Sequence, residues 1–236
     1  MPEDWFAGAV AERYDATLGA RAEPAVVGAT VDFLAGLAGA GSALELGIGT
    51  GRIALPLAAR GVRVSGIDLS PDMVAQLRAK PGGGEIPVRI GDFATTTLDE
   101  RFSLVYLVFN TINNLTSQDA QVACFENAAA HLEPGGCFVI EVGVPSREPL
   151  RVFDLSDAHV GVDEYEADTQ RLVSHHFTLV DGRWERLSIP FRAVGPGELD
   201  LMAQLAGMRL RERWGDWNRE PFTSDSRKLL GVWEKP

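Results

Sequence analysis

Three glycines spaced two apart follow an acidic residue in the segment Ala43-Leu-Glu-Leu-Gly-Ile-Gly-Thr-Gly51. Glycine has no Cβ, so the backbone at Gly47, Gly49 and Gly51 can turn sharply and approach a ligand closely. An apolar run precedes this loop, and a helical pattern follows it over residues 50–60. Such a strand, loop and helix are typical of a site for a nucleoside-bearing cofactor.

A second acidic residue, Asp68, directly follows the apolar run 62–67, which the pattern predicts to be a buried strand. In a doubly wound sheet, ligands bind outside the carboxyl ends of the parallel strands. An acid that ends the second strand can accept hydrogen bonds from a ribose. Asp68 is therefore expected to hold the ribose of the cofactor.

The position after the third glycine distinguishes two classes of cofactor. Dinucleotide loops follow the pattern G-x-G-x-x-G, in which the small last residue lets a pyrophosphate rest on the helix N-terminus. Counted from Gly47 and Gly49, that last position is Arg52, which is bulky. The pattern favours a cofactor without phosphate, and a nicotinamide-dependent oxidoreductase is the weaker alternative.

Further elements continue the alternation of strands and helices. Strands are predicted at 86–90, ahead of Gly91-Asp92-Phe93, at 102–109, ahead of Asn110, and at 137–142. A helix is predicted at 117–132, and a Pro-Gly-Gly turn at 134–136 follows it. This order predicts an α/β fold with a doubly wound, largely parallel sheet.

The pattern E-x-G-x-G-x-G from Glu45 to Gly51 resembles motif I of the class I S-adenosylmethionine (SAM)-dependent methyltransferases, and the later features resemble this family in the same order. The resemblance implies a Rossmann-like seven-stranded sheet with an antiparallel final strand, SAM as cofactor and S-adenosylhomocysteine as product. It is closest to bacterial small-molecule methyltransferases, including those that methylate sugar amines. The implied reaction is in-line methyl transfer to a nitrogen or oxygen of a small molecule.

From this resemblance and the pattern, a set of residues is expected to contact the cofactor. Asp92 and the neighbouring backbone match the family's contact to the adenine amino group, and Tyr14-Asp15 is similar to a pair near the sulfonium or the methionine part. Arg21 is a candidate for the methionine carboxylate. The full set is Tyr14, Arg21, Glu45, Gly47, Gly49, Gly51, Arg52, Asp68, Leu69, Met73, Asp92, Phe93 and Phe109.

The N-terminal segment and an insertion after the fifth strand are expected to form the part of the site that binds the methyl acceptor. Residues 1–40 are predicted to form a helical cap, with one helix at 4–18 and another after Pro24. Residues 145–195 are predicted to form an inserted lid, because strand patterns at 171–180 and 183–191 are joined by Asp181-Gly182, a strong hairpin signal. A helix at 197–206 and strands at 208–214 and 227–233 complete a single domain, 1–236.

The candidate catalytic residues are Asn110, Tyr14, His175 and His176. Asn110 can orient an acceptor, but an amide cannot serve as a base. His175 and His176 are neighbours on a predicted strand, so at most one can face the pocket. A structural role for either histidine, and a core role for Tyr14, are the alternatives. His131 is expected at the surface near a helix C-terminus, and Trp214, Trp217 and Phe222 either line an acceptor pocket or merely hold a turn.

Composition limits the partners that we expect. The net charge of −11 over 236 residues would repel nucleic acid and anionic membranes. No apolar stretch approaches about 18 residues, and no basic leader is present, so a cytoplasmic location is expected. Cys124 and Cys137 lack metal-ligand spacing, and no metal is expected. A small-molecule acceptor is the expected partner, a homodimer stays open, and a SAM-binding protein without methylating activity is an alternative.

Overall fold

The computed structural model describes residues 3–145 and 148–236, and a seven-stranded sheet forms its centre. The sheet order is β3-β2-β1-β4-β5-β11-β10. The first five of these strands pair in parallel, whereas β11 runs antiparallel to both of its neighbours. The strands are β1 Ser42–Leu46, β2 Arg63–Asp68, β3 Val88–Ile90, β4 Phe102–Leu107, β5 Leu132–Gly143, β10 Arg209–Trp214 and β11 Lys228–Glu234. The predicted doubly wound sheet with its antiparallel final strand is confirmed.

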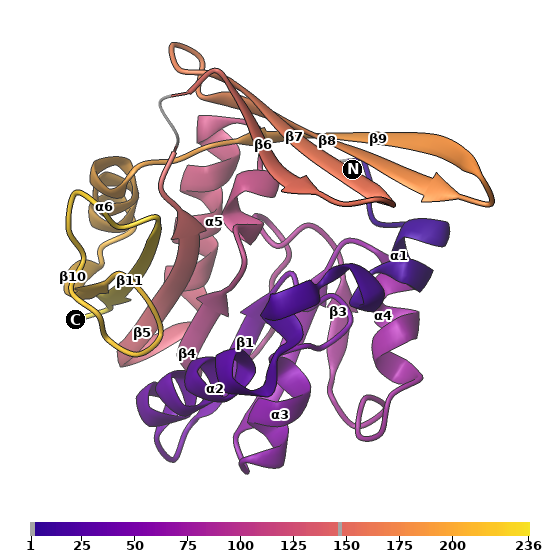
Figure 1. Ribbon diagram of the computed structural model, residues 1–236. Helices are drawn as coiled ribbons and strands as arrows, with labels where there is room; N and C mark the ends of the chain where they lie inside the picture. The colour runs from indigo at the N-terminus through magenta and orange to yellow at the C-terminus, as the bar shows by residue number, and fades with distance from the viewer. Residues whose placement is uncertain (1–2, 146–147) are drawn as a thin grey trace.

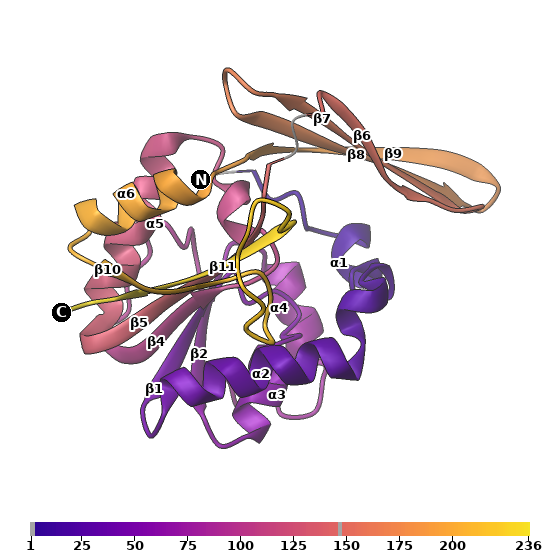
Figure 2. The same cartoon turned by 60° about the vertical axis from the view of Figure 1, so that its left-hand side comes forward.

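Helices cover both faces of this sheet (Figures 1 and 2). Side chains of α2 Pro24–Ala38, α3 Ala54–Ala59 and α4 Pro71–Arg78 join the buried cluster on one face. On the other face, α5 Gln118–His131 and α6 Pro196–Leu205 pack with the second cluster. Successive residues of a strand point to opposite faces of the sheet, so Ala43 of β1 belongs to the first cluster and Leu44 to the second. Both faces of the parallel sheet are therefore buried.

The helix predicted at 50–60 begins only at Ala54, so that prediction was too long. Residues 50–53 belong to the loop that follows β1. Pro56 is thus the third residue of α3, where its missing N–H would have had no partner within the helix.

The N-terminal segment contains short helices instead of the one predicted at 4–18. They are α1 Ala9–Arg13 and the 3-10 turns η1 Asp15–Thr17 and η2 Gly19–Ala22. Gly8 and Gly19 have φ values of 58° and 53°, which interrupt a right-handed helix. The segment still lies against the sheet domain, because the Gly8 N–H donates to Asp72 Oδ2 of α4 at 2.6 Å.

A separate four-stranded antiparallel sheet, the lid, lies between β5 and α6 in the chain. Its strands are β6 Leu150–Leu155, β7 His159–Glu166, β8 Arg171–Val180 and β9 Arg183–Arg192. The predicted hairpin is β8 and β9, joined by Asp181 and Gly182 at φ 49° and 76°, as a tight hairpin turn requires. Strands β6 and β7 were not predicted. Figures 1 and 2 show the lid over the edge of the main sheet where β5 ends.

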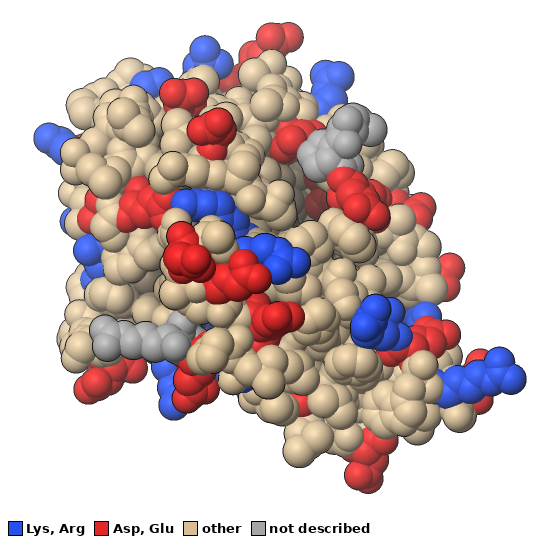
Figure 3. Space-filling view, turned by 90° about the horizontal axis from the view of Figure 1, so that it is seen from above, with Lys and Arg blue, Asp and Glu red and all other residues tan. Residues whose placement is uncertain are grey.

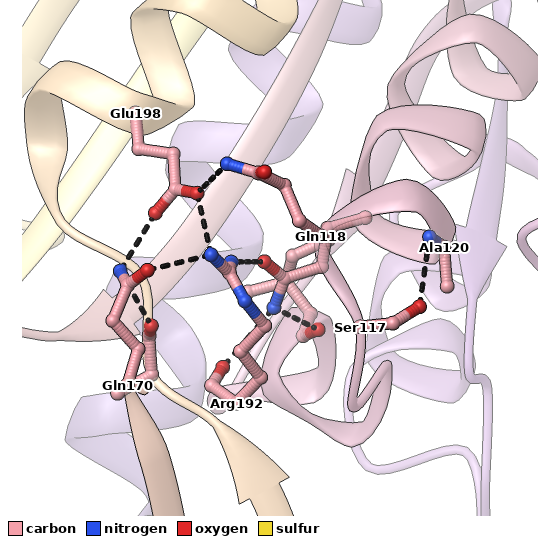
Figure 4. A network of polar contacts seen from close by, with 9 residues as sticks. Ser117, Gln118, Ala120, Gln170, Arg192 and Glu198 are labelled. Carbon is pink, nitrogen blue, oxygen red and sulfur yellow. Dashed lines mark hydrogen bonds and ion pairs between the residues drawn. The ribbon is translucent and has the colours of Figure 1, made fainter. Parts of the chain in front are cut away.

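A buried polar network fastens the base of the lid to two helices (Figure 4). Arg192 at the end of β9 is 7% exposed and pairs with Glu198 of α6 at 2.7 Å. Its guanidinium also donates to the amide oxygens of Gln121 on α5 and Gln170 ahead of β8. Gln118 and Gln170 donate their amide N–H groups to Glu198. The buried donors and acceptors of this network are therefore hydrogen-bonded to one another.

The outer surface is mixed in charge. Seen from above, acidic and basic side chains are interspersed with uncharged surface (Figure 3). The basic residues of β10 pair with acids: Arg209 lies 2.9 Å from Glu234, and Arg213 lies 2.6 Å from Asp200. Among the helices that the structure describes, none combines the length and apolar character needed to cross a membrane.

Candidate functional site

A hollow opens between the glycine loop, the N-terminal segment and the end of β4. The hollow is lined by Tyr14, Glu45, Gly47, Ile48, Gly49, Thr50, Arg52, Ile53, Val108, Phe109 and Thr111. Predicted site residues from three distant parts of the chain therefore meet in one place.

The glycine loop needs its glycines for both conformation and space. Gly47, Gly49 and Gly51 have φ values of 74°, 54° and 80°, in the left-handed region that side chains disfavour. A Cβ at Gly47 would meet the methyl group of Thr111 at 2.5 Å, and one at Gly51 would collide with Leu77. Gly51 thus shapes the turn from behind the pocket, whereas Gly47 and Gly49 line it.

Asp68 at the end of β2 supports the loop from the side. Its Oδ2 accepts the Gly49 N–H at 2.6 Å, and its Oδ1 accepts the Ser70 N–H at 2.9 Å. Burial raises the pKa of Asp68, and these N–H donors partly offset that effect. A carboxylate has about four acceptor sites, so two N–H bonds leave it able to accept from a ligand.

Glu45 forms a buried pair with a residue that the sequence did not single out. The Tyr106 hydroxyl of β4 donates to Glu45 Oε2 at 2.9 Å, and both side chains are fully or almost fully buried. Burial raises the pKa of Glu45 to about 8, while the Tyr106 hydrogen bond acts in the opposite direction. The floor of the hollow therefore carries an acid that titrates near neutral pH.

This raised pKa predicts a pH dependence of stability. The folded chain holds the Glu45 proton more tightly than the unfolded chain, so its contribution to the free energy of unfolding should fall as pH rises from 4.5 to 8. Glu45→Gln keeps an oxygen for Tyr106 and should remove this fall. Urea unfolding at pH 5.5 and 8.5, without SAM, measures the difference between the two proteins. Equal changes in both would contradict the assignment.

Two arginines and an aromatic ring form the rim. The guanidinium carbon of Arg21 lies 4.4 Å from the Phe109 ring centroid, and that of Arg52 lies 5.8 Å from it. Arg52 also donates to the Arg21 carbonyl at 3.2 Å. Burial raises the pKa of Tyr14 against the opposing effect of both arginines, so its phenol stays protonated at neutral pH. The two guanidinium groups are thus stacked near the Phe109 ring at the edge of the pocket.

Asp15 anchors this arrangement. Its carboxylate accepts the Thr50 hydroxyl at 2.6 Å and pairs with Lys80 at 2.5 Å. Lys80 also donates to the Thr50 carbonyl at 2.7 Å. Because Asp15 directly follows Tyr14, these contacts fix the N-terminal segment onto the glycine loop. Sequence reasoning did not predict Lys80 or Thr50, since no local pattern joins residues so far apart.

The turn after β4 is strained. Phe109 and Asn110 have φ values of 58° and 61°, a conformation that costs about 1–2 kcal/mol for each such residue. Glu141 of β5 accepts the Phe109 N–H at 3.0 Å, and the Asn110 side-chain oxygen accepts the Gly143 N–H. The strain places the Phe109 ring in the pocket wall and leaves Asn110 exposed beside it.

The remaining predicted cofactor residues lie beside the pocket and not in its lining. Asp92, just after β3, accepts the Ala94 N–H at 2.9 Å. The Phe93 ring is buried in the core, so only its backbone can face a ligand. Met73 is buried near Gly49, and Leu69 is half-buried after Asp68. These residues follow the carboxyl ends of β2 and β3, on the side where an elongated ligand would continue.

Two of the histidine predictions can be compared with the structure. His175 lies on the opposite face of β8 from His176, with its ring nitrogens near Ser188 and Glu164, so at most one of the two faces the pocket and the catalytic role of either stays a prediction. The surface position predicted for His131 is wrong: it is 1% exposed, contacts the Asn127 carbonyl and accepts the Leu98 N–H at 2.8 Å. Burial lowers the pKa of His131.

The aromatic residues near the C-terminus lie elsewhere. Trp217 packs edge-on against Phe33 of α2, with ring centroids 5.5 Å apart. Together with Arg219 and Asn218 it borders a second hollow, distinct from the one at the glycine loop. Trp214 donates its indole N–H to Glu212 at 2.9 Å. The sequence left two roles open for these tryptophans, to line an acceptor pocket or to stabilise a turn. Their contacts support the second role.

Comparison with known proteins agrees with this fold and site. The methyltransferase domain family matches residues 43–136. The CcbJ methyltransferase of Streptomyces caelestis is 35% identical, with a TM-score of 0.90 over 100% of this chain and 99% of that one. The cypemycin N-terminal methyltransferase of a Streptomyces species is 28% identical over 81% of this chain and 82% of the relative. A dTDP-3-amino-3,6-dideoxy-alpha-D-glucopyranose N,N-dimethyltransferase of Streptomyces fradiae is 31% identical over 66% of this chain and 58% of its own length.

The full-length match in sequence and fold places the chain in the SAM-dependent methyltransferases. It is an enzyme that uses SAM as its methyl donor. The motif that resembled this family, and the sheet that the resemblance implied, are thereby confirmed.

Proposed function

We propose that this enzyme methylates the amine nitrogen of a small molecule. The observation that carries the proposal is the match over the whole chain, lid included, to a methyltransferase of 35% identity. Two further relatives act on nitrogen by name, one at a peptide N-terminus and one on an amino sugar. The mixed charge of the face seen in Figure 3, and the net charge of −11, also suit a small acceptor better than a polyanion.

SAM supplies a methyl group on a sulfonium, which is already a good electrophile. In the proposal, Asp68 accepts hydrogen bonds from the ribose, and Gly47 and Gly49 let the backbone approach it. Asp92, the Phe93 backbone, Leu69 and Met73 receive the adenine. Glu45, Arg21 and Arg52 hold the charged methionine end, while Tyr14 and Phe109 offer aromatic faces to the cation.

The residues accelerate transfer mainly by position. Reaction in line requires that donor and acceptor be held close and that water be kept out. The anchored N-terminal segment closes one side of the pocket through Asp15, and the lid covers another. Asn110, exposed on a strained turn beside the pocket, can orient the acceptor. The cytoplasmic location, the absence of nucleic-acid and membrane partners, and a homodimer remain predictions.

The test uses methyl-labelled SAM and a metabolite extract of the cells that carry the gene. Mass spectrometry should find a labelled methyl group on nitrogen, and mild N-acetylation of the extract beforehand should abolish the labelled product. Label that survives N-acetylation and resides on oxygen would contradict the amine acceptor. Binding of SAM by calorimetry without any labelled product would favour the non-methylating alternative. Stabilisation by NADH alone would favour the oxidoreductase.

A further inference from the structure

Three lid side chains stand in a hydrogen-bonded line across three adjacent strands. Asp154 Oδ2 of β6 lies 2.8 Å from His159 Nδ1 of β7. His159 Nε2 lies 3.2 Å from His176 Nδ1 of β8. The two imidazole rings have centroids 5.4 Å apart. Of these three residues, only His176 was a catalytic candidate from the sequence, because the other two come from the strands that were not predicted.

When both imidazoles are neutral, the line of contacts fixes which of their nitrogens carry the protons. A carboxylate only accepts hydrogen bonds, so His159 must carry its proton on Nδ1 to donate to Asp154. Neutral His159 then has an unprotonated Nε2, which accepts from His176 Nδ1–H. Neutral His176 is left with a bare lone pair on Nε2. The atom that can act as a base is therefore Nε2 of His176, at the end of the line opposite Asp154.

One neighbour could occupy this lone pair. The Ser174 hydroxyl lies 3.3 Å from His176 Nε2. The same hydroxyl makes a hydrogen bond to the Asp163 carboxyl, which in its ionised form takes the single hydroxyl proton. The His176 lone pair then remains available to an N–H of a ligand.

Strand register places His176 on the inner face of the lid. His159 pairs with Thr178, and Thr178 pairs with Glu185 of β9, so these side chains share one face with His176. Glu185 forms an ion pair with Arg13 of α1 at 3.7 Å, which identifies this as the face toward the N-terminal segment. Arg21, whose guanidinium stacks on the Phe109 ring of the pocket wall, acts electrostatically on both His176 and Asp154.

The surroundings keep His176 neutral. Burial lowers the pKa of His176 below its usual range, with His159, Arg21 and His175 acting in the same direction and Asp154 opposing. The charged and titratable groups that face it are Asp154 on β6, His159 and Asp163 on β7, and Arg21 on η2. At neutral pH its ring is thus unprotonated, as a general base must be before it acts.

We propose that His176, held by His159 and Asp154, takes the proton of an ammonium acceptor before methyl transfer. This inference rests on the proposed amine function. The N–H bond of the acceptor breaks and its electron pair stays on nitrogen, while the proton bonds to His176 Nε2. The nitrogen pair then forms the new bond to the methyl carbon as the carbon–sulfur pair returns to sulfur. His176 is the catalytic residue; His159 and Asp154 are positioning residues.

The outer end of the line also has a role. The Asp154 side chain is 52% exposed, whereas that of His159 is 25% exposed. When His176 Nε2 takes a proton, its Nδ1 proton can pass to His159 Nε2, the His159 Nδ1 proton to Asp154, and one proton from the carboxylate to water. Both imidazoles are then neutral but carry their protons on Nε2, so the Nδ1–H tautomers must re-form by exchange with water before the next turnover.

A first test needs no acceptor. Two-bond nitrogen–proton couplings of ¹⁵N-labelled histidines should show His176 at pH 7.5 as the Nδ1–H tautomer, with a pKa below that of an exposed histidine. Asp154→Asn should disturb the tautomer of His159, and His175→Asn, on the opposite face, should leave both tautomers unchanged. An Nε2–H tautomer of His176 in the wild-type protein would overturn the proposal.

A second test measures the initial rate of label transfer from SAM to the same metabolite extract between pH 5 and 9. His176→Asn should lower the rate at least about 100-fold and remove the acidic limb of the profile, as the loss of a general base does. Asp154→Asn should give a smaller loss and move the limb to lower pH, whereas His175→Asn should keep the wild-type rate above the limb and move the limb slightly to higher pH, because His175 is the last of the groups that lower the pKa of His176. SAM affinity measured by calorimetry should stay unchanged in all three.

The outcomes separate this inference from the proposed function. A His176→Asn enzyme that keeps the rate and the acidic limb would overturn the proton transfer while leaving amine methylation intact. If wild-type enzyme labels only oxygen, the amine function fails, and the ammonium step fails with it. The histidine tautomers would then still report whether the line of hydrogen bonds exists.

Discussion

Arg192→Leu is expected to lower the free energy of unfolding by about 3–5 kcal/mol, the usual result of removing one partner from a buried ion pair. Leucine would leave the Glu198 carboxylate without its cation and the oxygens of Gln121 and Gln170 without their donor. These groups are packed between the base of the lid and two helices, where water cannot easily replace the guanidinium (Figure 4).

Urea unfolding at pH 7 measures this change. The matched control is Arg209→Leu, which removes another Arg–Glu contact of similar length, but one in which the arginine side chain is 69% exposed. Surface pairs contribute about 0–1 kcal/mol, so the control should remain close to wild type. Similar losses in both variants would show that burial of the Arg192 network does not determine its contribution.

Asp68→Ala should weaken SAM binding at least about tenfold, or about 1.4 kcal/mol, because a hydrogen bond to a charged group is lost. The variant also removes the acceptor for the Gly49 N–H, so the loop loses support on the side that faces the ligand. Calorimetric titration with SAM gives the dissociation constant directly, without requiring an acceptor.

Two companion variants make this result specific. Asp68→Asn keeps one side-chain oxygen for the loop, so it should retain more of the folded stability than Asp68→Ala while still losing affinity. Asp32→Ala removes an exposed carboxylate that pairs with Arg60 and does not line the hollow at the glycine loop, and it should bind SAM as wild type does. A titration curve for Asp68→Ala that overlays the wild-type curve would refute the ribose role.

Local patterns predicted the parts of the fold that local physics determines. Apolar runs such as 102–109 became buried parallel strands because both sheet faces are covered. Asp181-Gly182 predicted its hairpin because few residues tolerate the required backbone angles. Strand β6 was missed because Leu150, Val152 and Leu155 are exposed, so burial does not impose an apolar alternation on it.

The site shows the same division. The glycine loop and Asp68 were predicted because a ligand-binding turn has a recognisable spacing. Contacts between distant residues had no such signal: Lys80 reaches Asp15, and His131 accepts a hydrogen bond from Leu98. The Asp154–His159–His176 line also depends on strand register, which brings together residues that no sequence motif connects.

The lid leaves the main sheet after β5 and returns to it before α6, so all four of its strands form one continuous excursion of the chain. The glycine loop, Asp68 and the residues that surround them lie outside this excursion. In the proposed function, where the lid lies on the acceptor side, substitutions in it would therefore reshape that side while the donor side keeps its geometry. Such a division would let a new acceptor specificity evolve by exchange of one contiguous segment. A replacement segment would have to keep Arg192, because its contacts join the base of the lid to α5 and α6.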